Sequence, residues 1–167
     1  MLFCFEQWIS IALKQQQLKG FNPMKNTLAA ITLALCLIPA TSFARDDIGN
    51  YSVTDALSTE QANNKLGTDI SFYFGDQVYG EPQQQFGEFS TSKKTNAFNK
   101  SDLEACHWVF LSAMITLKER AIKEGGNAVI GIKSNYKNNL TSSNDTFQCG
   151  AGTFVAGVAL TGKVVKL

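Results

Sequence analysis

Histidine is almost absent from this 167-residue sequence, in which His107 is the single example. One histidine excludes any two-histidine metal site, and it leaves His107 as the sole imidazole for a Ser–His or Cys–His pair. Its neighbour Cys106 does not complete such a pair, because adjacent residues on a helix point about 100° apart and do not face each other. We therefore expect no catalytic role for His107 and no enzymatic activity.

A charge excess of either sign is also missing. The chain has 15 Lys and Arg against 14 Asp and Glu, a net charge of +1, and it contains no basic run. Nucleic acid and anionic lipid attract proteins through clustered positive charge, so this balance argues against both as partners. The spacings C-x-x-C and H-x-x-x-H do not occur either, and we expect no bound metal or cofactor.

Residues 24–44, MKNTLAAITLALCLIPATSFA, have the three parts of a secretory signal peptide. A short basic start precedes an apolar run, and Ser42 and Ala44 supply the small residues of a cleavage site. The apolar run, 28–38, is shorter than the roughly 20 residues that a membrane-spanning helix needs. We expect cleavage between Ala44 and Arg45, which would export the protein without a stable membrane anchor.

Two alternatives concern the same region. Lipidation at Cys36 would anchor the mature chain, but Leu35 stands where lipoprotein cleavage requires a small residue. Residues 1–23 are an extended start of the signal, a membrane-associating element, or a mis-annotated extension ahead of a true start at Met24. Glu6 and the glutamines of this stretch interrupt any apolar face, which favours the mis-annotated extension.

The remaining chain is predicted to contain a polar segment with a short helix, 45–68, and a single α+β domain, 69–167. The pattern Ser-Thr-Glu-Gln at 58–61 is a capping box, and Gly67 would close a helix of about two turns. A second capping box at Ser101 begins a long helix that Gly125 and Gly126 end. Its predicted buried face consists of Leu103, Cys106, Phe110, Ala113, Leu117 and Ala121.

Alternating or β-branched stretches on both sides of the long helix predict strands. In the last of them, Phe154, Ala156, Val158 and Leu160 are expected on one face. The order, a short helix followed by ββαββ, predicts an α+β fold in which one long helix packs on one face of a small, mostly antiparallel sheet. The predicted strands are 69–79, 86–91, 127–136, 146–149 and 154–167, with turns at 80–82 and 138–145.

The stretches GGNAVIGIKSNYKNN and FQCGAGTFVAGVAL carry a resemblance to known families. They resemble the small domain of the YbjQ-type proteins, the heavy-metal-binding-domain family, and of the envelope stress-sensing Rcs lipoprotein. The chain is also similar to short exported proteobacterial proteins labelled "excinuclease ATPase subunit". Over residues 69–167 the resemblance implies the α+β fold and a bacterial envelope location. Ser134 and Asn135 stand where the Rcs lipoprotein keeps a cysteine, so its disulfide pattern and signalling role do not carry over.

The ATPase label has one near match in the chain, the stretch GVALTGKV at 157–164. The phosphate-binding pattern GxxxxGK[ST] needs a hydroxyl for magnesium and a helix that starts at the phosphates. Val164 has no hydroxyl, and the alternation through Val165 predicts a strand. We therefore reject nucleotide hydrolysis.

Cleavage of the signal would leave Cys106 and Cys149 as the two cysteines of the exported protein. Two thiols in an oxidising compartment form a disulfide more often than a metal site. We expect a Cys106–Cys149 disulfide. The alternatives are two separate buried thiols, or a metal site that also uses His107.

Glycines and a polar loop are the remaining candidates for a binding surface. Gly150, Gly152 and Gly157 are expected to mark a bulge or a close approach of two backbones rather than a phosphate site. Binding residues are frequent on loops, so we expect the loop 138–145 and the outer strand face to form the interaction surface. The expected function is binding of an unknown envelope protein in the periplasm, with a small-ligand or metal-binding protein as the alternative. The candidate loop residues are Asn138, Asn139, Asn144 and Asp145.

Overall fold

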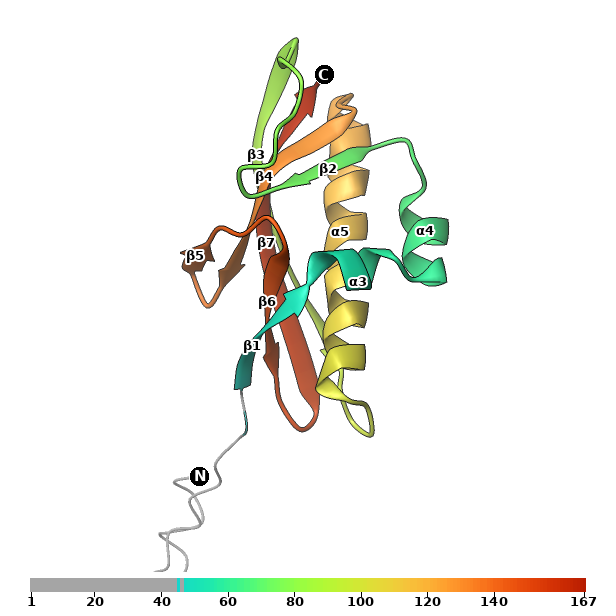
Figure 1. Cartoon of the computed structure of the whole chain (residues 1–167), viewed down its shortest axis with the longest axis vertical. Helices are drawn as coiled ribbons and strands as arrows, with labels where there is room; N and C mark the ends of the chain where they lie inside the picture. The colour runs from blue at the N-terminus through green and yellow to red at the C-terminus, as the bar shows by residue number, and fades with distance from the viewer. Residues whose placement is uncertain (1–44, 46) are drawn as a thin grey trace, which may run out of the picture. The chain divides into compact units, whose positions relative to one another are not determined.

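The computed structural model describes residues 45 and 47–167, and residues 47–167 lie in one compact unit (Figure 1). The predicted signal peptide and the extension before it lie outside the described residues. Within the described part, no helix is long and apolar enough to cross a membrane. The elements in chain order are β1 (Asp47–Ser52), α3 (Val53–Leu57), α4 (Glu60–Leu66), β2 (Ser71–Phe74), β3 (Gln84–Asn96), α5 (Asp102–Glu124), β4 (Ala128–Tyr136), β5 (Asn139–Thr141), β6 (Thr146–Ala151) and β7 (Val155–Lys166).

The predicted small sheet is wrong: the described strands form one seven-stranded mixed sheet. Its path runs β1-β6-β7-β4-β2, with β3 paired to β7 and β5 paired to β4. The β2–β4 pair is parallel and the other pairs are antiparallel. Parallel pairing arises because the chain crosses from β2 through β3 and α5 before it returns as β4.

Two strands were missed by the sequence prediction, and two others have different lengths. Strand β1 lies in the segment predicted to be polar and helical, and it pairs with β6 along its whole length. Strand β5 lies in the predicted polar turn. Strand β2 has four residues rather than the eleven expected, whereas β3 has 13 residues instead of six. Polar residues predominate in the missed strands β1 and β5, so their pairing depends on neighbouring strands rather than on an apolar pattern.

Helix α5 begins and ends as its sequence predicts. The hydroxyl of Ser101 accepts a hydrogen bond from the Glu104 amide at 3.1 Å, and Gly125 adopts the left-handed conformation that closes the helix. The short helix α4 ends at Gly67 as predicted, but its N-cap is Thr59 rather than Ser58, because Ser58 closes the preceding helix α3. The helix α5 covers one face of the sheet, while β5 lies on the other side (Figure 1).

The core lies between α5 and the sheet. The rings of Phe110 on α5 and Phe147 on β6 stack at 3.9 Å between centroids. Leu103 was predicted to belong to this core, but it is 53% exposed because it lies in the first turn of the helix, at the end of the core. Phe154 is 64% exposed, since it precedes β7 in the turn from β6. The other predicted positions are buried: Cys106, Phe110, Ala113, Leu117, Ala121, Ala156, Val158 and Leu160.

Candidate functional site

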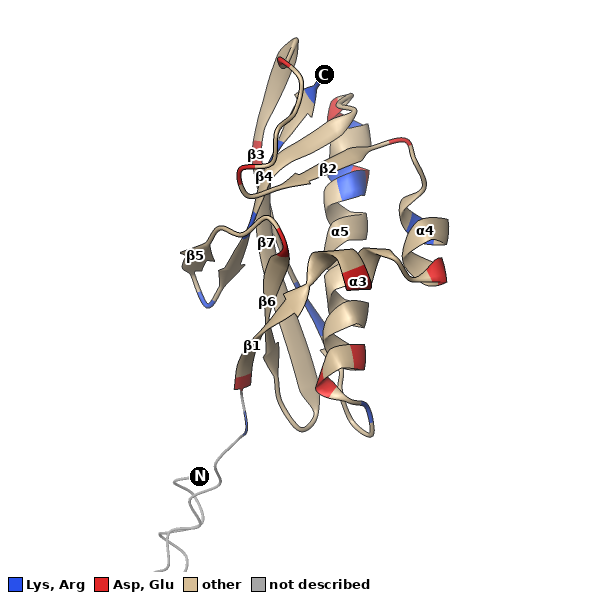
Figure 2. Cartoon of the chain, in the orientation of Figure 1, with Lys and Arg blue, Asp and Glu red and all other residues tan. Residues whose placement is uncertain are grey.

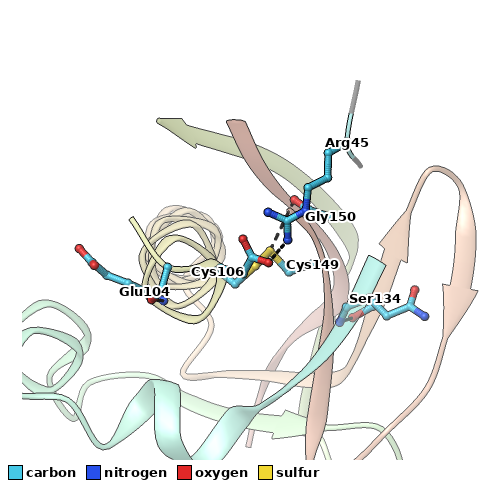
Figure 3. The surroundings of a disulfide bond; sticks show 9 residues. Arg45, Glu104, Cys106, Ser134, Cys149 and Gly150 are labelled. Atoms are coloured by element: carbon cyan, nitrogen blue, oxygen red, sulfur yellow. Dashed lines mark hydrogen bonds and ion pairs between the residues drawn. A yellow bond between two sulfur atoms is a disulfide. The ribbon is translucent and has the colours of Figure 1, made fainter. Parts of the chain in front are cut away.

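The two cysteines join α5 to β6. The sulfur atoms of Cys106 and Cys149 are 2.01 Å apart and their Cα atoms 5.9 Å apart, as in a disulfide. Arg45 lies beside this bond (Figure 3), where its guanidinium donates to the carboxylates of Asp47 and Asp102. These two hydrogen bonds raise the pKa of Arg45. The disulfide leaves neither sulfur free as a nucleophile or metal ligand.

The alternative metal site has no set of ligands in the described part of the chain. There, no group of three or more His, Cys, Asp or Glu residues is arranged to hold a metal ion. The stretch 157–164, which approaches the phosphate-binding pattern, lies within β7. A strand offers no helix amino terminus to a phosphate.

The single histidine lines a small cleft between α4 and α5. Its volume is about 160 Å³, and Glu104, Trp108 and Leu111 of α5 form one wall. The Nε2 atom of His107 is buried and has no hydrogen-bond partner. Burial lowers the pKa of His107, and the charge of Asp55 opposes this effect. The unsatisfied nitrogen favours the neutral imidazole, but no described acid–base partner bonds to it.

The predicted close approach of two backbones occurs at Gly152, whereas the nearest neighbour of Gly150 and Gly157 is the Tyr136 side chain. A Cβ on Gly150 would lie 1.9 Å from the Tyr136 hydroxyl oxygen, and one on Gly157 would lie 3.4 Å from the Tyr136 ring. Gly150 of β6 and Gly157 of β7 are cross-strand partners. Because neither has a side chain, the Tyr136 ring packs directly against the backbone of the sheet at this pair. A Cβ on Gly152 would meet the Arg45 carbonyl oxygen at 2.7 Å. These glycines make room for protein atoms.

We call the side of the sheet away from α5 the open face. Phe89 of β3 faces α5, because its ring contacts the guanidinium of Arg120. Side chains alternate along a strand, so the even-numbered residues of β3 lie on the open face: Glu88, Ser90, Ser92 and Lys94. A small apolar cluster also lies outside the main core. It comprises Ala128, Ile130, Val165, Tyr73 and Leu167.

Two clefts on the open face flank the β4–β5 hairpin. The larger, of about 500 Å³, has charges of both signs: Asp76 and Glu88, with Lys133 and Lys163. The smaller, of about 380 Å³, is lined by polar side chains: Ser90, Ser92, Asn135, Lys137 and Asn138. Figure 2 likewise shows acidic and basic residues spread over the molecule rather than gathered in one patch of a single sign. The arrangement suits a polar partner that carries both charges.

The predicted loop residues separate into two roles. Asn138 lines the smaller cleft and Asn139 begins β5. Asn144 holds the neighbouring turn, because its Oδ1 accepts from the Asp76 amide at 2.8 Å and its carbonyl accepts from Gln77 Nε2 at 3.1 Å. The carbonyl of Asp145 accepts from the Val53 amide at 2.8 Å. The structure thus brings one part of the loop to the clefts and uses the other part for support.

Sequence reasoning missed the charged and hydroxyl residues of β3 in these clefts. Glu88, Ser90 and Ser92 alternate with Phe89 and Thr91, which was the available signal for a two-faced strand. A second exposed feature is the stacked pair Phe98 and Phe154, with ring centroids 5.7 Å apart. No family model, curated protein or solved structure matches this chain.

Proposed function

We propose that this protein is an exported, non-enzymatic binding protein of the bacterial envelope, which binds another envelope protein through the open face. The observation that carries the proposal is the pair of polar clefts beside the β4–β5 hairpin. Helix α5 occupies the opposite face of the sheet, so these clefts are available to a partner. Peptide chains offer both charges and backbone hydrogen-bonding groups, which match the lysines, carboxylates and hydroxyls there.

The periplasmic location rests on the sequence of residues 24–44 and on the resemblance to envelope proteins. The Cys106–Cys149 pair supports it, because disulfides persist in oxidising compartments. Intact-mass measurement of protein made in an export-competent host is expected to give the mass of residues 45–167. A diacylated species that begins at Cys36, or a product that retains Met1, would contradict the proposed processing.

Photo-crosslinking in living cells tests the binding face. A photoreactive amino acid replaces Asn135 or Asn138, which line the smaller cleft and lie outside the edge strand β3. The matched control carries it at Glu119, an exposed position on α5. We expect both cleft positions, and not Glu119, to yield the same crosslinked envelope protein by mass spectrometry. Equal products from all three positions would contradict a role for the open face.

The alternative function, binding of metal or a small ligand, has its own readout. Protein purified natively from the periplasm is analysed for metal and, by native mass spectrometry, for bound small molecules. We expect neither in stoichiometric amount. Stoichiometric metal would overturn the proposal, and a bound small molecule displaced by Ser92→Trp would assign the clefts to that ligand instead.

A further inference from the structure

Strand β3 forms a long edge of the sheet. Its 13 residues pair with β7 along one side, and within residues 47–167 no other strand pairs with it. An edge of this length offers a row of backbone N–H and C=O groups to another strand. The bulge between Gln85 and Gly87 limits the regular part of the edge to residues 87–96.

The backbone groups that point away from β7 can be assigned from the ladder. The Ala97 amide donates to the Phe154 carbonyl at 2.9 Å, in the same register that pairs Gly87 with Val164. In an antiparallel ladder every second residue bonds to a given neighbour, so the odd-numbered residues of this stretch bond to β7. The even-numbered residues therefore direct their N–H and C=O groups outward: Glu88, Ser90, Ser92 and Lys94.

The sequence of this edge is complementary to itself. If a second copy pairs antiparallel about an axis through Thr91, Glu88 of one copy lies opposite Lys94 of the other, and the contact occurs twice. Ser90 of one copy lies opposite Ser92 of the other, and the outward N–H and C=O groups of these two residues bond to each other. About eight backbone hydrogen bonds would form in this register. Moving the axis to Ser90 or Ser92 leaves Glu88 opposite serine or asparagine, without an ion pair.

We propose that two copies of this chain pair through β3 in the register centred on Thr91 and form a symmetric dimer with one continuous sheet. Lysines on an edge strand ordinarily oppose edge-to-edge pairing. In the proposed dimer, Lys94 lies opposite the Glu88 carboxylate of the second copy. Because the other registers lack this ion pair, Glu88 and Lys94 favour the register centred on Thr91. The proposal does not depend on the identity of the envelope partner.

The dimer has a consequence for the open face. In this register the even-numbered residues of one copy lie opposite the even-numbered residues of the other, and opposite residues share a face of the sheet. Both α5 helices therefore lie on one side of the joined sheet, and both open faces lie on the other. Ser90 and Ser92 line the smaller cleft of each copy, and these residues flank the axis. The two clefts would then lie side by side across the axis, which suits a partner that is itself two-fold symmetric or has two binding segments.

A charge exchange across the axis tests the dimer. Glu88→Lys places two positive charges opposite each other at both contacts, and Lys94→Glu places two negative charges there. Each variant is expected to raise the dimer dissociation constant about tenfold or more, measured by analytical ultracentrifugation of the oxidised protein at low salt. Lys123→Glu makes the same charge change as Lys94→Glu, at an exposed position on α5, and is the matched control for that variant, expected to dimerise like the unchanged protein.

Restoring dimerisation with a second charge change would show that the single variants lose the ion pair of this register rather than their fold. The Glu88→Lys/Lys94→Glu double variant, and an equimolar mixture of the two single variants, restore opposite charges at both contacts. We expect both to dimerise again. Unchanged protein that remains monomeric at about 1 mM would overturn the proposal and leave the edge to a strand of another protein. Failure of the mixture to recover, with normal unfolding midpoints for each variant, would overturn the register.

Discussion

The two faces of the sheet differ in what covers them and in what their side chains do. Under α5, buried apolar side chains pack around the stacked rings of Phe110 and Phe147, and the disulfide crosses the same layer. On the open face, the Tyr136 ring lies over a pair of glycines, and one charged and one polar cleft flank the β4–β5 hairpin. The comparison indicates that stability depends mainly on the covered face, while the open face carries the polar clefts that we propose for binding.

The largest expected effect is a cavity under the helix. Phe110→Ala removes a fully buried ring that stacks on Phe147 at 3.9 Å, and we expect a loss of about 3–5 kcal/mol in the free energy of unfolding. Ser92→Ala on the open face is the control and should change stability by about 0.5 kcal/mol or less. Denaturant titration measures both. Similar losses for the two variants would remove the distinction between the faces.

Loss of the disulfide is expected to have the next largest effect. The bond closes a loop with a sequence separation of 43, and replacement of both Cys106 and Cys149 by alanine should cost about 2–4 kcal/mol. The cause in the chain-entropy model is greater freedom of the unfolded chain. Thermal and denaturant unfolding measure the loss. Peptide mapping of unreduced protein should show the two cysteines linked, and full alkylation of both thiols would contradict the bond.

A smaller loss of stability is expected when a side chain is added to the glycine pair against which the Tyr136 ring packs. Gly150→Ala forces the Tyr136 ring to move and should cost about 1–3 kcal/mol. The same substitution in a Tyr136→Ala background meets no ring and should cost less. A double-mutant cycle by denaturant titration gives the coupling, expected at about 0.5–3 kcal/mol. Additive effects would show that the ring and the glycine do not constrain each other.

The smallest effect concerns pH. Burial lowers the pKa of His107 below its ordinary value of 6.5, so the unfolded chain takes up a proton before the folded one does as pH falls. Stability should therefore be independent of His107 above that value and decline below it. His107→Gln removes this titration, and its stability relative to the original protein should rise between pH 7.5 and pH 5, roughly the range in which histidine titrates. A constant difference across the range would contradict the burial of the imidazole.

Much of the long helix could be predicted because its signals are local. The cap at Ser101, the glycine stop and the three- and four-residue spacing of Cys106, Phe110 and Leu117 depend on neighbours in the chain. The same spacing places Cys106 toward the sheet, where Cys149 meets it. Leu103 shows the limit of this reasoning, since the periodicity gives a face but not where the opposing layer ends.

Which polar segments pair as strands of the sheet depends on the tertiary structure. The polar strand β1 forms because it pairs with β6, and β5 forms because it pairs with β4. No local sequence pattern predicts such pairing. The clefts depend on the same pairing, because Glu88, Lys133 and Lys163 come from three strands that are far apart in the chain. Local signals in the sequence predict the long helix, most of its buried face and the two cysteines that form the disulfide. The size of the sheet, its parallel pair and the polar surface of the open face required long-range hydrogen bonds, which only the folded chain brings together.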